Sequence, residues 1–175
     1  MLFRSAAAGF SSDAVDAAKS ECQAVPASAA ACEQLASLYA DSSDAAALGA
    51  ALSLLKTLAP DGAAAHYYTA ALAFLKGDAK EALESAQKAI AVDAEYAAAY
   101  DMAGAAHTKL GQPDLAAQAF QTSLRFDPHD STAYTNLGLL ALAAGNQGAA
   151  RNYFAEALWL RPDDKAAVEG MSRAR

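Results

Sequence analysis

A pattern that repeats every 34 residues constrains this chain more than any other feature. Three glycines, Gly77, Gly111 and Gly145, are spaced 34 residues apart. Other columns of residues 97–130 and 131–164 agree at the same offset, in the pairs Tyr100 and Tyr134, Gly104 and Gly138, Ala116 and Ala150, Phe120 and Phe154, and Pro128 and Pro162. A fixed period of this length, with a glycine halfway and a proline near the end, indicates an array of helical hairpins that bury one another.

Each half of a repeat has the apolar spacing of a helix. Leu137, Leu140 and Ala144 recur at this spacing before the turn at Gly145, and a second apolar run follows it up to Pro162. The chain contains 51 alanines and only five prolines, so helix propensity is high throughout. Gly138 is expected where only a small residue lets a neighbouring helix approach closely.

In these columns the chain resembles the tetratricopeptide repeat (TPR) family. The resemblance implies an all-α, right-handed superhelical solenoid of helix-turn-helix repeats with capping helices at both ends. The expected units are a flexible N-terminus (1–10), a capping helix and turn (11–28), a degenerate repeat (29–62), three repeats (63–96, 97–130 and 131–164) and a C-terminal capping helix (165–175). The repeat at 29–62 is degenerate because Ala36 and Ser43 stand where the family has glycines.

Charge and motifs argue against several classes of function. The net charge is −7, and residues 1–130 carry most of the acidic excess, so a nucleic-acid partner is not expected. No stretch approaches the roughly 20 strongly apolar residues of a membrane-spanning helix, so direct membrane insertion is not expected either. No catalytic pattern, phosphate-binding loop or metal-ligand spacing is recognisable, and we predict no enzyme activity, no cofactor and no metal site.

Two cysteines, Cys22 and Cys32, lie ten residues apart on consecutive predicted helices, symmetric about the turn at Ala27. This symmetry would place them opposite one another in an antiparallel hairpin, within reach of a disulfide. The alternative is two buried free cysteines in a cytoplasmic protein. A disulfide would favour an oxidising compartment such as a bacterial periplasm, and free cysteines would favour the cytoplasm.

The resemblance also implies a binding surface, because the first helix of each TPR unit lines a concave groove. The family's groove columns fall on Glu33, Ser37, Tyr67, Ala71, Phe74, Asp101, Ala105, Thr108, Lys109, Thr135, Leu139 and Leu142. We expect this groove to be apolar at its centre, with Tyr67, Phe74, Leu139 and Leu142 as anchors for a peptide. For Tyr67 and Phe74, packing on neighbouring helices is the alternative.

Two further features bear on the partner. A TPR subclass binds a C-terminal carboxylate through Lys, Asn and Arg, but this chain has Tyr67, Asp101 and Thr135 in one of those columns, so binding of chaperone tails is not expected. Trp159 occupies the column of Ala91 and Arg125, where it either contacts a partner or a second copy, or packs beneath residues 164–174.

The sequence therefore predicts a non-enzymatic protein-binding adaptor that holds a peptide segment in its groove, with a role in bacterial cell-envelope assembly as an extension. The alternative function is a scaffold that assembles with copies of itself through its repeat ends or the Trp159 region.

Overall fold

The structure is a computed structural model that describes residues 12–24 and 27–174. The expected flexible segment 1–10 lies outside these residues. The described chain is all-helical, as the repeat pattern predicts. Its helices are α1 (Ser12–Cys22), α2 (Ala29–Asp41), α3 (Ala45–Leu58), α4 (Ala63–Leu75), α5 (Ala79–Val92), α6 (Ala97–Lys109), α7 (Pro113–Phe126), α8 (Ser131–Ala143), α9 (Gln147–Leu160) and α10 (Lys165–Arg173).

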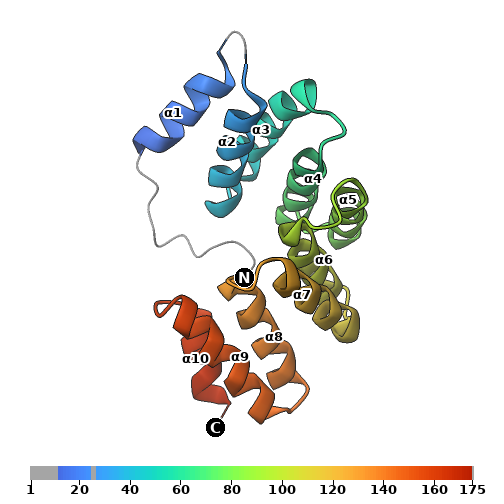
Figure 1. Ribbon diagram of the computed structural model, residues 1–175, viewed down its shortest axis with the longest axis vertical. Coiled ribbons are helices and arrows are strands. Elements are labelled where there is room, and N and C mark those ends of the chain that lie inside the picture. The colour runs from blue at the N-terminus through green and yellow to red at the C-terminus, as the bar shows by residue number, and fades with distance from the viewer. Residues whose placement is uncertain (1–11, 25–26, 175) are drawn as a thin grey trace.

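Consecutive helices pair into hairpins, which stack along an arc (Figure 1). The hairpins are α2–α3, α4–α5, α6–α7 and α8–α9, and each stacks on the next through α3 with α4, α5 with α6, and α7 with α8. The first helices also meet across hairpins, since α2 contacts α4 and α4 contacts α6. We call the side shared by α2, α4, α6 and the start of α8 the inner face. No described helix is long and apolar enough to span a bilayer.

The turns inside the hairpins explain the glycine column. Gly77, Gly111 and Gly145 have φ angles of 89°, 71° and 74°, in the left-handed region that glycine adopts without a steric penalty. Ser43, in the same column, also has a positive φ of 59°. The degenerate repeat therefore keeps the family's turn with a residue that is strained in it.

Helix starts follow two further columns of the repeat. Asp44, Asp78, Asp130 and Asp164 are the N-caps of α3, α5, α8 and α10, and each carboxylate accepts hydrogen bonds from two backbone N–H groups of the first turn. These caps satisfy donors that the helix itself leaves unpaired.

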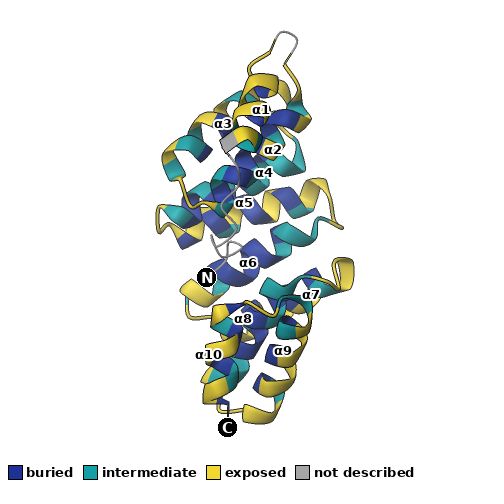
Figure 2. Cartoon of the chain, turned by 90° about the vertical axis from the view of Figure 1, so that its left-hand side faces the viewer, coloured by how far each residue is buried: buried dark blue, intermediate teal, exposed yellow. Residues whose placement is uncertain are grey.

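The core consists of alanines and a few large side chains that run through the middle of the array (Figure 2). Phe154 is fully buried, and a Cβ built on Gly138 of α8 would lie 2.5 Å from its ring, which confirms that only glycine fits there. Gly104 has the same relation to Phe120, at 2.8 Å. Gly170 of α10 also lies against the Phe154 ring, and α10 packs on α9 and α8, so it covers the end of the array.

A disulfide joins the first two helices. The Sγ atoms of Cys22 and Cys32 are 2.08 Å apart, and the two Cα atoms are 4.6 Å apart. Both residues are buried. The bridge fastens α1 to α2, and through it to the rest of the array.

Candidate functional site

The inner face contains a pocket of about 300 Å³. Four helices and one turn contribute to its wall, which lies between the start of α6 and the start of α8 and extends to α2 and α4. The lining residues are Ser37, Asp41, Tyr67, Ala97, Ala98, Asp101, Met102, Asp127, His129, Asp130, Ser131 and Thr132. Aspartates are the only carboxylic acids among them, and none of these lining residues is a lysine or an arginine.

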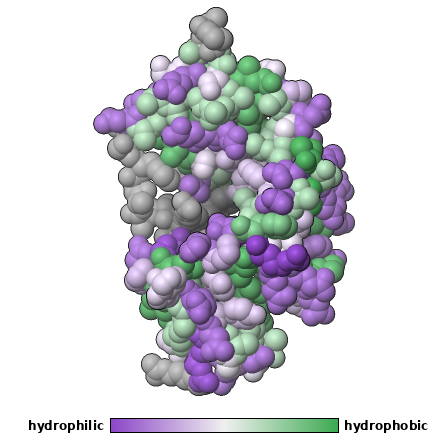
Figure 3. All heavy atoms as spheres, in the orientation of Figure 1, coloured by the Kyte–Doolittle hydropathy of each residue, from purple (hydrophilic) through white to green (hydrophobic). Residues whose placement is uncertain are grey.

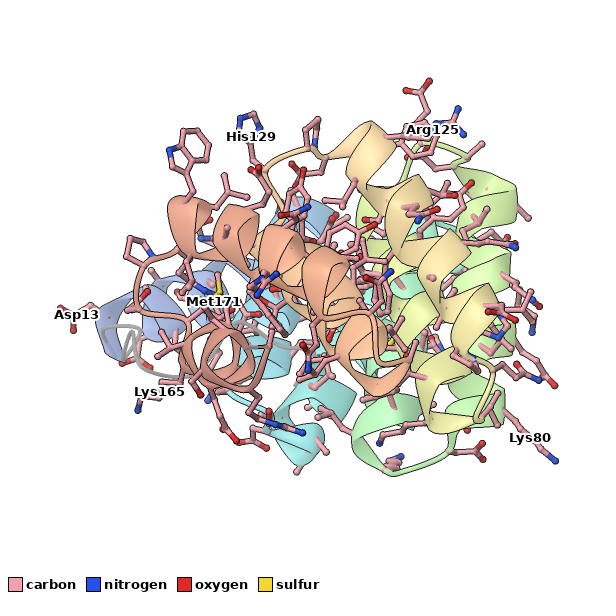
Figure 4. The ribbon with its side chains drawn as sticks, turned by 90° about the horizontal axis from the view of Figure 1, so that it is seen from below. Asp13, Lys80, Arg125, His129, Lys165 and Met171 are labelled. Atoms are coloured by element: carbon pink, nitrogen blue, oxygen red, sulfur yellow. A yellow bond between two sulfur atoms is a disulfide. The ribbon has the colours of Figure 1, made fainter. Side chains whose placement is uncertain are left out.

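The turn between α7 and α8 contributes two of the aspartates. Asp127 Oδ1 accepts a hydrogen bond from His129 N at 3.0 Å, and Asp130 Oδ1 accepts from Thr132 N at 2.7 Å and from Ala133 N at 3.2 Å. Because these backbone bonds hold both side chains in place, their charge stays at the edge of the pocket. His129 is exposed, and its ring projects outward from the same turn (Figure 4).

Asp101 on α6 is the buried carboxylate of the pocket. It is only 9% exposed, and its Oδ1 atom is buried without a hydrogen-bond partner. Burial, followed by the neighbouring carboxyl groups of Asp130 and Asp127, raises the pKa of Asp101 well above its ordinary value. The helix that carries it is fixed at its start, since Ser123 Oγ on α7 donates to Ala97 O at 3.0 Å.

Tyr67 on α4 forms the aromatic part of the wall. Its ring packs edge-on against Tyr68 and Tyr96, with centroid distances of 4.9 and 5.5 Å. Burial, with smaller contributions from neighbouring tyrosines, Asp101 and Asp41, raises the pKa of Tyr67 well above its ordinary value. At neutral pH it therefore presents a neutral phenol beside the carboxylates.

The other expected groove residues divide into two groups. Ala71 and Ala105 are buried between helices, with exposed fractions of 0% and 3%. Phe74 is also buried, and Lys109 Nζ lies 3.8 Å above its ring centroid. Thr108 and Lys109 are exposed. Of the expected residues, Ser37, Tyr67 and Asp101 line the pocket.

The last repeat is covered by the C-terminal helix. Thr135 is buried, and its hydroxyl donates to Asp164 Oδ2 at 2.9 Å. Arg161 Nη2 donates to the same oxygen at 2.7 Å. Burial alone would raise the pKa of Asp164, but the bonds from Arg161, Thr135 and the Ala167 N–H lower it below its ordinary value. Leu139 and Leu142 are half-buried against the cluster of α9 and α10.

Trp159 is 76% exposed near the end of α9. Trp159 therefore does not pack beneath residues 164–174, which was one of the two alternatives expected from the sequence. The face seen in Figure 3 shows hydrophobic and hydrophilic residues in small interspersed patches.

The aspartates of the α7–α8 turn and Asp41 were not anticipated from the repeat columns, because those columns include only helix positions. An expected apolar centre is instead lined by carboxylates. The available signal was the Asp-Pro-x-Asp segment 127–130, whose aspartates hold the turn and cap the next helix.

Stacked helical hairpins with a glycine turn and a buried aromatic in each of the later units define a helical repeat protein of the solenoid class. The tetratricopeptide repeat family model matches residues 97–130 and 131–164. These two units of the chain are therefore tetratricopeptide repeats, and such repeats act as scaffolds for protein–protein interaction.

Solved structures have the same fold. The chain is 26% identical to MamA, with a TM-score of 0.61 and coverage of 85% of this chain and 86% of that chain. It is similar to a chain of the APC/C hetero-tetramer Cut9–Hcn1 at 20% identity and a TM-score of 0.77, covering 90% of this chain and 32% of that one. It is also similar to the first TPR of Spaghetti (RPAP3) bound to HSP90 peptide SRMEEVD, at 17% identity and a TM-score of 0.62, covering 64% of this chain and 89% of that one.

Proposed function

We propose that this protein is a non-enzymatic adaptor that holds a segment of a partner protein against its inner face. The proposal depends on the pocket between α6 and α8, whose wall combines side chains from several helices. A similar TPR structure contains a bound peptide, which supports the same use of the fold. Recognition then depends on the few side chains that differ between repeats.

The inner face is suited to an extended segment because its helices are held rigidly. The starts of α3, α5 and α8 are capped by aspartates, and α6 is tied to α7 through Ser123. A surface that is ordered before binding loses little conformational entropy when a peptide docks.

The test is a selection of peptides from a random 12-residue library on the purified chain, followed by binding to two variants. Ala98→Tyr places a bulky side chain at the pocket wall, because Ala98 is half-exposed there. Gln87→Tyr makes the matched change at an exposed position of α5 that does not line the pocket. We expect Ala98→Tyr to weaken selected peptides by at least about tenfold, which corresponds to about 1.4 kcal/mol. Equal binding to both variants would refute a site on the inner face.

The alternative function, self-assembly, is supported by the exposed Trp159. A large aromatic side chain in water is unfavourable unless a partner covers it, and Val168 on α10 is exposed as well, at 52%. If copies associate through this region, the mass measured by sedimentation rises with concentration and Trp159→Ala abolishes the rise. A constant monomer mass for the wild type would exclude this function.

A role in the cell envelope is the most specific part of the proposal. The disulfide between Cys22 and Cys32 supports it, since such bridges persist in oxidising compartments such as the bacterial periplasm. Thiol labelling of the protein in cells of its source tests this step. Cysteines that react without prior reduction would contradict it.

A further inference from the structure

We propose that the pocket on the inner face binds a positively charged side chain, arginine in preference to lysine, from the docked segment of the partner. This inference rests on the proposed function and adds the chemistry of the residue that is recognised. Its basis is a buried carboxylate oxygen without a partner, set among further carboxylates in a pocket open to solvent.

The unpartnered atom is Asp101 Oδ1. A buried carboxylate oxygen without a hydrogen bond is costly, and native structures usually satisfy such atoms with protein groups, water or a ligand. Asp101 lines the pocket and is nine-tenths buried. Its side chain also has hydrogen-bond interactions with Asp130 and Ser123, so a donor that enters the pocket meets this group of side chains. A cation would also relieve the repulsion from Asp130 and Asp127, which contributes to the raised pKa of Asp101.

Charge complementarity selects a cation over other ligands. Asp41, Asp101, Asp127 and Asp130 line the pocket, and among its described lining residues only His129 can carry a positive charge. The ring of His129 projects outward at the edge of the molecule (Figure 4). The basic residues Lys80 and Arg125, which are labelled in Figure 4, lie on α5 and α7, and neither lines the pocket. An anionic segment would meet these carboxylates with only His129, at the edge, to offset them.

A metal ion is a weaker candidate than a side chain. Across residues 12–24 and 27–174, no three His, Cys, Asp or Glu side chains are grouped so that they could hold a metal ion. Asp127 and Asp130 each commit an oxygen to backbone N–H groups. The remaining oxygens suit the directional donors of an organic cation better than the close ligand shell of a metal.

Arginine fits the shape and the mixed chemistry of the wall. Its planar guanidinium has several donors that can contact carboxylates from α6 and from the α7–α8 turn together, whereas lysine is a compact point charge. Tyr67 offers an aromatic surface beside them, on which a guanidinium can stack. The volume of about 300 Å³ equals about ten water molecules, which is more than one such side chain requires.

The experiment is an NMR titration of the ¹⁵N-labelled chain at low ionic strength with Nα-acetyl-arginine amide. The uncharged Nα-acetyl-citrulline amide and the polyamine spermidine are titrated in parallel. We expect saturable shifts of the amide signals of Ala98, Asp101 and Thr132 with the arginine probe, and a dissociation constant at least about tenfold lower than that of citrulline.

Matched variants assign the effect to the pocket. Asp101→Asn with Asp130→Asn replaces two carboxyl groups of its wall by amides, and asparagine keeps the cap of α8. The control, Asp44→Asn with Asp93→Asn, removes two charges at exposed positions that make the same kinds of backbone bonds elsewhere. The pocket variant should lose about tenfold in affinity for the arginine probe, and the control should change it by less than about twofold.

Three results would overturn the inference. These are equal shifts with arginine and citrulline, an equal loss in the control variant, or saturable binding of spermidine without binding of arginine. If the inference fails while selected peptides are still blocked by Ala98→Tyr, the proposed function stands and only the arginine chemistry falls. If the selected peptides are not blocked, the proposed function itself fails.

Discussion

The close packing of Phe154 against a glycine allows the steric part of the repeat to be measured separately. Gly138 lies inside α8, and a Cβ at this position would meet the buried ring of Phe154 at 2.5 Å. Gly49 lies inside α3, where a Cβ would have its nearest contact at 3.8 Å, with Leu72 Cδ2. Changing each glycine to alanine therefore makes the same chemical substitution with and without a clash.

The expected magnitudes follow from two opposing effects. Alanine in a helix interior is favoured over glycine by about 1 kcal/mol, and this gain is common to both variants. Overpacking a filled core costs about 1–3 kcal/mol, and it applies only at Gly138, because the fully buried Phe154 ring is also packed against Gly170 and has little room to move. Gly49→Ala should raise the free energy of unfolding by about 1 kcal/mol, and Gly138→Ala should lower it by up to about 2 kcal/mol.

The assay is urea unfolding followed by circular dichroism at 222 nm. With a denaturant slope of about 2 kcal/mol/M, the midpoints of the two variants should differ by about 0.5–1.5 M. Adding Phe154→Leu to Gly138→Ala should reduce the penalty of the glycine change, because the smaller side chain makes room for the Cβ. Equal stabilisation by both single variants would refute the packing argument.

Three more predictions follow from the turns and the buried carboxylates. Ser43→Gly should stabilise the chain by up to about 1 kcal/mol, measured by urea unfolding, because it removes the strain of a left-handed serine at the cost of a more flexible unfolded chain; a loss of stability would contradict this. Thr135→Val should lower the free energy of unfolding by about 1.5–3 kcal/mol at pH 7, since it removes a hydrogen bond to the charged Asp164. Because folding lowers the pKa of Asp164, the stabilisation by this bond is present above the unfolded pKa of about 3.9 and is lost as pH falls through the folded pKa. An equal penalty in acid would contradict this. For Asp101 the pH dependence has the opposite sign, because its pKa is raised on folding. The stability of the protein therefore falls as pH rises from about 3.9 to the folded pKa. Asp101→Asn should raise the melting temperature at pH 7 and reduce the fall in melting temperature between pH 4 and 8. The groups facing Asp101 are Asp41 on α2, Tyr67 on α4 and the α7–α8 turn residues Asp127 and Asp130, and a melting temperature lowered equally at every pH would show that none of them disfavours its charge.

The period of the sequence was sufficient to predict the fold, because each column has a local physical cause. The glycine turn requires a positive φ, and the buried ring of Phe154 requires Gly138 opposite it. Such requirements act within one repeat or between neighbours, so they recur every 34 residues and can be recognised.

The site could be predicted only in part, because the pocket depends on contacts between repeats. Ser37, Tyr67 and Asp101 were expected on the groove, and all three line the pocket. The orientation of Thr135 toward Asp164 depends on where α10 docks, which no repeat column specifies. Likewise, Asp127 and Asp130 hydrogen-bond within their own turn, and they line the pocket because it lies between this turn and the start of α6.

The central claim, that the inner face is the contact site for a partner, is tested most directly by photo-crosslinking in cells of the source. A benzoylphenylalanine is placed at Ala98 on the pocket wall or at Gln87 on α5, and the attached peptides are identified by mass spectrometry. The account predicts that position 98 captures one partner through a segment that contains an arginine, and that position 87 does not. Capture of the same proteins from both positions, or only of a second copy of the chain from position 98, would contradict it.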